Sequence, residues 1–116
     1  MEKRRYARIN LSDEGWRAEL INQLNDDKLG DVVNLSEGGA MIITPLALQA
    51  DNLYQTECRL TGPDGQTEGF AAGMTVLWRA DAAQPGNYWA GLQIIDIDED
   101  SRGRLEALTR TLVTNG

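Results

Sequence analysis

The stretch LGDVVNLSEGGAMIIT, residues 29 to 44, has the pattern of two strands joined by a tight turn. LGDVVNL (29–35) and AMIIT (40–44) are rich in β-branched and other apolar residues, as strands are. The segment SEGG between them consists of residues that favour turns, and its two glycines permit positive φ angles and a close approach of another backbone. The stretch therefore predicts a β-hairpin within an antiparallel sheet.

Segments of the same character continue on both sides of this hairpin and are separated by turn signals such as NDDKLG and TGPDGQ. The further predicted strands are WRAELINQL (16–24), LYQTECRL (53–60), GFAAGMTVLWRA (69–80) and YWAGLQIID (88–96). In the second of these, alternate residues should share one face, and they are Tyr54, Thr56, Cys58 and Leu60. Six strands joined mainly by hairpin turns predict a mainly β protein, an antiparallel barrel over residues 16–96.

The end of the chain changes to a helical period. In DEDSRGRLEALTRTLV, the residues Leu105, Leu108 and Leu112 fall on one stripe of a helix. We expect a C-terminal helix over residues 100–114 that closes one end of the barrel, with Asp100 or Ser101 as its N-cap.

Length and composition indicate one folded domain over residues 1–116. Hydrophobic residues make up 41% of the chain and charged residues 25%, as in globular proteins. The start of the chain has no apolar run that could serve as a signal peptide, and no stretch is apolar enough to insert into a membrane. Because Cys58 is the single cysteine, an internal disulfide is excluded, so we expect a cytoplasmic protein.

The composition argues against an enzyme. There is no histidine, which removes the commonest general base and the commonest metal ligand, and a lone thiol cannot form a zinc site. We expect Cys58 to be a small buried core residue. The acidic runs at residues 26–27 and 96–100 lie where turns and helix starts favour carboxylates. We therefore expect no catalytic residue, no metal and no cofactor.

Basic residues are concentrated in EKRRYARIN, residues 2 to 10. Four of the eleven basic residues lie in the first eight positions, and they are Lys3, Arg4, Arg5 and Arg8. The rest of the chain carries seventeen acidic and seven basic residues, a net charge of -10. An acidic body disfavours DNA or RNA, whereas a small anion at the arm remains open. We expect residues 1–10 to form a flexible basic arm, and a basic terminus of this kind is usually only a solvated tail.

Two short motifs give the arm a second interpretation. Arg4 and Arg8 form the pattern Arg-x-x-x-Arg, and about 25 residues later Asn34, Ser36 and Gly39 form Asp/Asn-x-Ser-x-x-Gly. Each motif alone is common. In this order, with a predicted strand between them and a hairpin at the second, the chain resembles the PilZ family of cyclic di-GMP receptors. The resemblance extends over nearly the whole chain, including its last strand and its final helix.

The resemblance implies a bacterial barrel that binds cyclic di-GMP without catalysis. The implied ligand-binding residues are Arg4, Arg8, Asn34, Ser36 and Gly39, with Arg5 and Trp78 as secondary candidates. The chemistry agrees, because a guanidinium group can donate two parallel hydrogen bonds to guanine or phosphate and can stack on a base. Residues four apart on an extended arm span up to about 13 Å, so two arginines can hold separate parts of a dinucleotide.

The other candidates have narrower roles. The amide of Asn34 would meet a guanine edge, where the family often has Asp, and the hydroxyl of Ser36 would meet a phosphate or the local backbone. Gly39 would leave room for the ligand. Arg5 would reach a phosphate or a second ligand molecule, or remain solvated. Trp78 would pack on a guanine or, the interpretation we favour from the sequence, in the core.

We therefore predict a single-domain receptor whose arm is ordered over the barrel by the ligand. The signal would pass to a separate, unidentified protein that controls motility, biofilm or exopolysaccharide production. One alternative is a PilZ-like adaptor that contacts proteins without any ligand. A second is a barrel that binds single-stranded nucleic acid, which seven aromatic residues and a net charge of -7 disfavour. The sequence leaves open whether the ligand binds singly or as a stacked pair.

Overall fold

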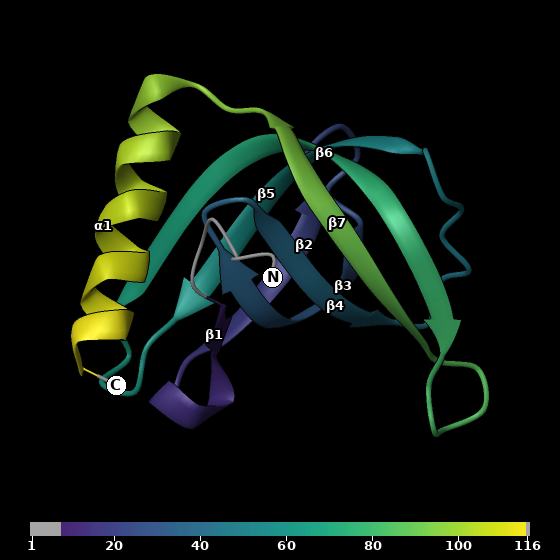
Figure 1. Ribbon diagram of the computed structural model, residues 1–116, viewed down its shortest axis with the longest axis horizontal. Coiled ribbons are helices and arrows are strands. Elements are labelled where there is room, and N and C mark those ends of the chain that lie inside the picture. Colours follow the sequence, from purple (N-terminus) through teal and green to yellow (C-terminus); the bar gives the residue numbers. More distant parts are fainter. Residues whose placement is uncertain (1–7, 116) are drawn as a thin grey trace, which may run out of the picture.

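The structure, a computed structural model, describes residues 8–115 (Figure 1). The strands of that part of the chain are β1 (Ile9–Asn10), β2 (Arg17–Asn22), β3 (Lys28–Ser36), β4 (Gly39–Thr44), β5 (Leu53–Thr61), β6 (Thr67–Asp81) and β7 (Tyr88–Asp96). A short 3-10 helix, Ser12–Glu14, connects β1 to β2. The α-helix of the described residues, α1 (Glu99–Asn115), follows the last strand.

The strands form one antiparallel sheet that closes on itself. Their order is β1-β3-β2-β5-β6-β7-β4, and a further pairing between β3 and β4 closes the six longer strands into a barrel, with β1 paired to β3 outside the closure. Closure pairs the long strands on both edges, which removes the open edges of a flat sheet. The predicted six-stranded antiparallel barrel with a C-terminal helix is confirmed, with β1 as one extra short strand in the described residues.

The extra strand shortens the predicted arm. Ile9 pairs with Leu35 and is 6% exposed, and Asn10 pairs with Asn34. The prediction of a flexible arm is therefore wrong for residues 9 and 10. Its physical reason is that the apolar side chains of Ile9 and Leu11, two positions apart, both enter the core. Residues 1–7 lie outside the described residues.

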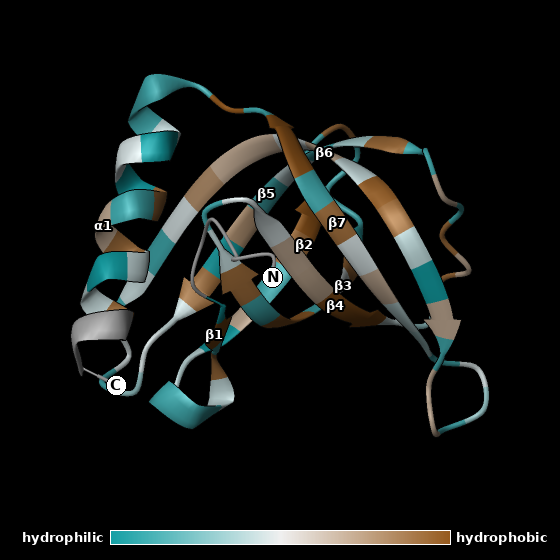
Figure 2. Cartoon of the chain, viewed as in Figure 1, coloured by the Kyte–Doolittle hydropathy of each residue, from teal (hydrophilic) through white to brown (hydrophobic). Residues whose placement is uncertain are grey.

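The core fills the barrel from alternating positions of the strands, and Figure 2 shows hydrophobic and hydrophilic residues alternating along them. In β5 the predicted inward face is confirmed, because Thr56, Cys58 and Leu60 are buried and Tyr54 packs partly against the core. The Thr56 hydroxyl donates a hydrogen bond of 2.8 Å to the carbonyl oxygen of Ala72. Burial raises the pKa of the Cys58 thiol to about 12, so this thiol stays protonated and unreactive near neutral pH.

The helix packs against β6 through the predicted leucine stripe. Leu105, Leu108 and Leu112 are all buried in the core. The N-cap prediction is wrong, because the carboxylate of Asp98 accepts a 2.7 Å hydrogen bond from the backbone N–H of Ser101. The Ser101 hydroxyl is instead 1% exposed and accepts a hydrogen bond from the N–H of Ala71 in β6. Several consecutive residues could have capped this helix, and contact with β6 decides among them.

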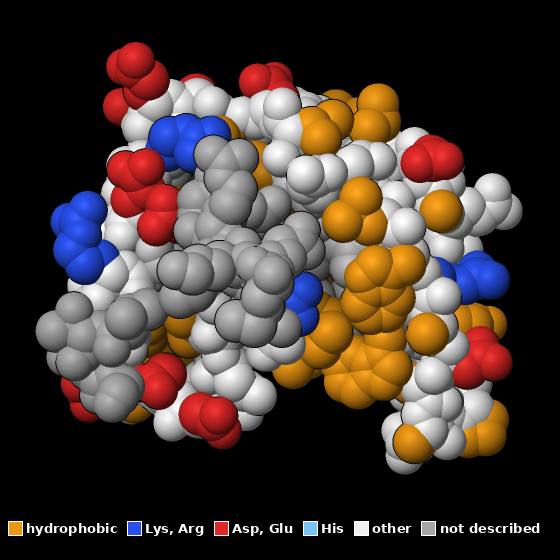
Figure 3. Space-filling model, in the orientation of Figure 1, with side chains coloured by type: hydrophobic (Ala, Val, Ile, Leu, Met, Phe, Trp, Pro, Cys, Tyr) orange, Lys and Arg blue, Asp and Glu red, His pale blue; other side chains and the backbone are white. Residues whose placement is uncertain are grey.

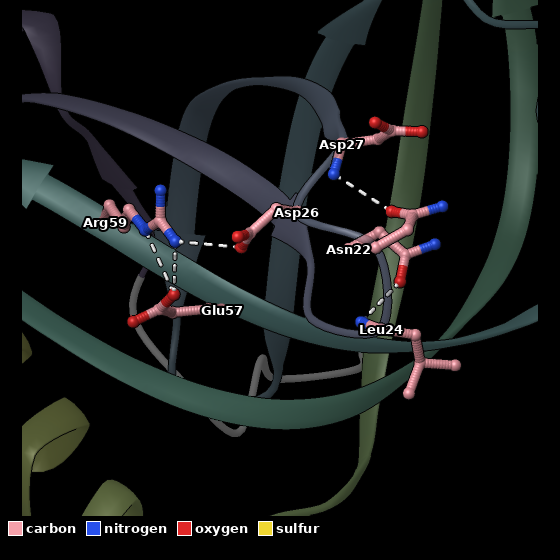
Figure 4. Close-up of polar contacts among 7 residues, drawn as sticks. Asn22, Leu24, Asp26, Asp27, Glu57 and Arg59 are labelled. Carbon is pink, nitrogen blue, oxygen red and sulfur yellow. Dashed lines mark hydrogen bonds and ion pairs between the residues drawn. The ribbon is translucent and has the colours of Figure 1, made fainter.

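The turn between β2 and β3 accounts for one of the acidic runs (Figure 4). The side-chain oxygens of Asn22 and Asn25 accept hydrogen bonds from the N–H groups of Leu24 and Asp27. Asp26 has a φ of 63° and lies 3.4 Å from the guanidinium group of Arg59, which also pairs with Glu57. Asp26 and Asp27 thus belong to the turn, as predicted from their position in the sequence.

Truncation of a buried leucine of α1 tests how the helix is held. Leu105 is 1% exposed, whereas Leu24 at the β2–β3 turn is 82% exposed. We expect Leu105→Ala to lower the free energy of unfolding by about 2–5 kcal/mol, because it removes buried methyl groups and leaves a cavity. The same substitution at Leu24 should change it by less than about 0.5 kcal/mol. Urea unfolding of both variants measures this, and equal losses would contradict the packing described.

Candidate ligand-binding groove

A shallow groove crosses the outer face of the barrel over β3, β4, β7 and β6, and its volume is about 240 Å³. Two rows of directly paired residues form its floor, namely Asn34, Met41, Gly91 and Trp78 in the first and Ser36, Gly39 and Gln93 in the second. Figure 3 shows this face, with a group of hydrophobic side chains over the region of β6 and β7. The volume is below the roughly 300 Å³ of typical small-molecule pockets, so a dinucleotide would be only partly enclosed here.

Arg8 lies at the border of the groove, just before β1. Among the described residues that line the groove it is the only charged one. Its exposed side chain has no ion-pair partner among the described residues, whereas Lys28 and Arg59 each lie within 3.4 Å of two carboxylates. A lone cation over a neutral floor attracts an anion into the groove. The other arginine of the motif, Arg4, and the secondary candidate Arg5 lie outside the described residues.

Two β-bulges turn the groove residues outward. In β3, Val32 pairs with Ile42 but Asn34 pairs with Met41, so Val33 is an extra residue. The alternation shifts there, which places Leu35 in the core and Asn34 on the outer face. Without the bulge, the same alternation would point the Asn34 amide into the barrel.

The second bulge explains where Trp78 lies. Val76 pairs with Leu92 and Trp78 pairs with Gly91, so Leu77 is the extra residue. Trp78 is consequently 40% exposed and lines the groove, and the expectation that it packs in the core is wrong. Its indole lies against Gly91, since a Cβ atom at that position would overlap the indole nitrogen. The large flat side chain therefore forms one end of the groove floor.

Gly39 lies close to another backbone, as the sequence predicts, but without a positive φ. Its φ is not positive, and it lies in β4 paired with Gln93 and next to the backbone of β7. A Cβ atom there would overlap the carbonyl oxygen of Leu92 and lie 3.1 Å from the Cα of Gln93. The absence of a side chain thus allows β4 to approach β7.

Ser36 ends β3 and holds the hairpin turn. Its Oγ accepts a 3.1 Å hydrogen bond from the backbone N–H of Gly38, which is the local backbone contact considered from the sequence. The carbonyl oxygen of Gly38 accepts a hydrogen bond from the N–H of Ile94 in β7. Because the hydroxyl is an acceptor in the turn, its own proton remains available to donate to an anion in the groove.

Asn34 lies at the end of the first row, opposite Met41 in β4 and Asn10 in β1. Its side chain is half-buried and lines the groove, and it makes no hydrogen bond to another described residue. The structure thus brings together Arg8, Asn34, Ser36, Gly39 and Trp78 around one groove. Every predicted site residue within residues 8–115 therefore lines this groove.

Several groove residues were not predicted from the sequence, and three of them lie in the floor. Met41, Gly91 and Gln93 occupy outward positions of β4 and β7 between the two ends of the groove. The glycine in YWAGLQ was a usable signal, because a glycine inside a strand often marks a close approach of another group. Its partner was not evident, since only the bulge at Leu77 brings Trp78 over it.

Replacing Gly39 by alanine tests the close approach of β4 to β7. The added Cβ would overlap backbone atoms that cannot move independently, so we expect the free energy of unfolding to fall by about 1–3 kcal/mol. Gly103 in α1 is the matched control, because a Cβ there meets nothing within 4 Å. Gly103→Ala should stabilise by about 0.8–1 kcal/mol. Chemical denaturation distinguishes the two, and a neutral Gly39→Ala would contradict this packing.

Within residues 8–115, no group of three or more His, Cys, Asp and Glu side chains is arranged to hold a metal ion. No described helix has the length and apolar character needed to cross a bilayer.

Solved structures share this fold. The PilZ domain of YcgR from Escherichia coli, solved with c-di-GMP, is 16% identical with a TM-score of 0.71 over 98% of this chain and 94% of that one. The K. pneumonia MrkH–c-di-GMP complex is 18% identical with a TM-score of 0.73, over 99% of this chain and 54% of that one. The Bacillus subtilis inhibitor of motility MotI/DgrA is 14% identical with a TM-score of 0.66, over 98% of this chain and 53% of that one.

This chain therefore spans about half the length of MrkH and MotI and nearly all of the YcgR domain. At such identities the likeness establishes the fold alone. No curated protein matches the chain in sequence. The family model described as PilZ domain, however, matches residues 2–111. The chain belongs to the PilZ domain family.

Proposed function

We propose that this chain is a receptor for cyclic di-GMP that has no catalytic activity of its own. The observation that carries the proposal is the groove, in which the described motif residues Arg8, Asn34, Ser36 and Gly39 lie together with the indole of Trp78. Cyclic di-GMP presents two guanines and two phosphodiester anions, and the groove offers groups suited to both. The complexes of YcgR and MrkH with this ligand support the same assignment.

The two ends of the groove suit two different bases. Asn34 and Trp78 lie in one row on β3 and β6, with β4 and β7 between them. At about 4.8 Å per strand their Cα atoms are roughly 14 Å apart. One guanine would meet the amide of Asn34 at its edge, while the second would stack on the indole of Trp78.

The phosphates would be held by donors along the border of the groove. The Ser36 hydroxyl has a proton to donate, and Arg8 has no carboxylate partner among the described residues. Arg4, the first arginine of the motif, and its neighbour Arg5 would add guanidinium groups from the preceding residues. The arm would be ordered by the ligand, because two phosphate charges offset the repulsion among its basic side chains.

The output would pass to a separate protein. A chain whose described residues form one barrel and one helix can signal by presenting an altered surface. Binding would replace the exposed Arg8 cation and the exposed face of Trp78 with a covered, neutralised groove. We propose that a cytoplasmic bacterial partner controlling motility, biofilm or exopolysaccharide production recognises this change.

Calorimetric titration with cyclic di-GMP tests the proposal. We expect micromolar or tighter binding by the wild type. Arg8→Ala and Arg4→Ala should each weaken binding by about 1–3 kcal/mol, because each removes a bidentate contact. Arg8→Lys should recover only part of the loss, since an ammonium group keeps the charge but lacks the planar fork.

The matched control is Arg17→Ala. Arg17 is an exposed arginine of β2 that lines a different hollow over β2, β3 and β5, so its removal changes the net charge equally without touching the groove. The affinity of the Arg17→Ala variant for cyclic di-GMP should stay within about twofold of the wild-type affinity. If the folded wild type gives no binding heat, the proposal is wrong and a ligand-independent adaptor becomes the better explanation. Equal losses for Arg17→Ala and Arg8→Ala would mean that only net charge matters.

A further inference from the structure

The β3 end of the groove presents an amide whose two polar ends are both available. Asn34 makes no side-chain hydrogen bond to any described residue, although it pairs directly with Asn10 and Met41. The side-chain oxygen of Asn10 is already engaged, because it accepts a 2.8 Å hydrogen bond from the Ser12 hydroxyl. Met41 offers no strong donor or acceptor. Nothing in this part of the structure therefore fixes which end of the Asn34 amide points toward a ligand.

This matters because an amide and a carboxylate read a purine differently. A carboxylate only accepts hydrogen bonds, whereas an amide carries one acceptor oxygen and one donor NH₂ group. Rotation by 180° about the last side-chain bond exchanges the two. An unconstrained amide can thus present donor and acceptor in either order, and a carboxylate at the same position cannot.

The edges of guanine and adenine require opposite orders. Guanine offers the N1–H donor beside the O6 acceptor, and adenine offers the N1 acceptor beside the N6 amino donor. The amide of Asn34 can make two hydrogen bonds with either base after rotation. A carboxylate can pair with the N1–H and N2–H donors of guanine, but it opposes the lone pair of adenine N1. The residue at position 34 would therefore decide whether adenine is tolerated.

The opposite end of the groove does not decide between the two purines. Trp78 accepts either purine, because stacking depends on the flat face of the base. Since Asn34 and Trp78 lie three strand spacings apart, the amide can meet only one of the two bases.

We propose that this groove accepts a cyclic dinucleotide with one guanine and one adenine in addition to cyclic di-GMP. The inference rests on the proposed function and adds to it a wider ligand class, set by Asn34. The adenine lies at Asn34 and the guanine on the indole of Trp78.

Calorimetric titration of the full chain with cyclic di-GMP and 3′,5′-linked cyclic GMP–AMP tests this. For the wild type we expect the mixed ligand to bind within about tenfold of cyclic di-GMP. If cyclic di-GMP binds but the mixed ligand is more than about a hundredfold weaker, the inference is overturned while the proposed function stands.

Two variants assign the effect to Asn34. In Asn34→Asp the ratio of affinities for cyclic di-GMP and the mixed ligand should rise by roughly five- to 150-fold, because the carboxylate rejects adenine. The ratio is the readout because the added negative charge weakens both ligands alike. In Asn34→Ala both ligands should lose affinity with little change in the ratio. An unchanged ratio in Asn34→Asp would overturn the inference, and no binding of cyclic di-GMP to the wild type would overturn the proposed function itself.

Discussion

The outer face of this barrel depends on two extra residues, Val33 in β3 and Leu77 in β6. Each interrupts the alternation of its strand, so the residues that follow exchange faces of the sheet. Asn34 is turned outward at one end of the groove and Trp78 at the other. In β3 buried residues continue past the bulge, whereas in β6 every residue from Leu77 onward is exposed.

The motif residues divide into those that build the hairpin and those left for a ligand. Gly39 lets β4 lie against the backbone of β7, and the Ser36 side chain accepts a hydrogen bond within the turn. Arg8 and Asn34, by contrast, make no hydrogen bond or ion pair with the described residues. Within residues 8–115 the groove thus has one cation and one amide without a partner in that range, a combination suited to a purine nucleotide.

Much of the fold could be predicted from the spacing of apolar residues and from turn residues. Buried residues alternate along β5 and recur at helical spacing along α1, as Cys58 and Leu105 illustrate. The candidate site followed from the motifs, and the structure places their described members around one groove. Trp78 was misassigned because strict alternation from Val76 would direct it inward, and a bulge is not visible in apolar periodicity. Burial of Ile9 was missed because local charge dominates the arm, while pairing with β3 is a long-range contact.

The central claim is that a nucleotide lies between Asn34 and Trp78 on the bulged face. An NMR titration of the ¹⁵N-labelled chain with cyclic di-GMP tests it most directly through the side-chain amide of Asn34 and the indole N–H of Trp78. The account predicts that both signals shift until saturation, while the indole signal of Trp16, only 9% exposed in the core, stays in place. Saturable shifts elsewhere in the spectrum with both groove signals unmoved would contradict it.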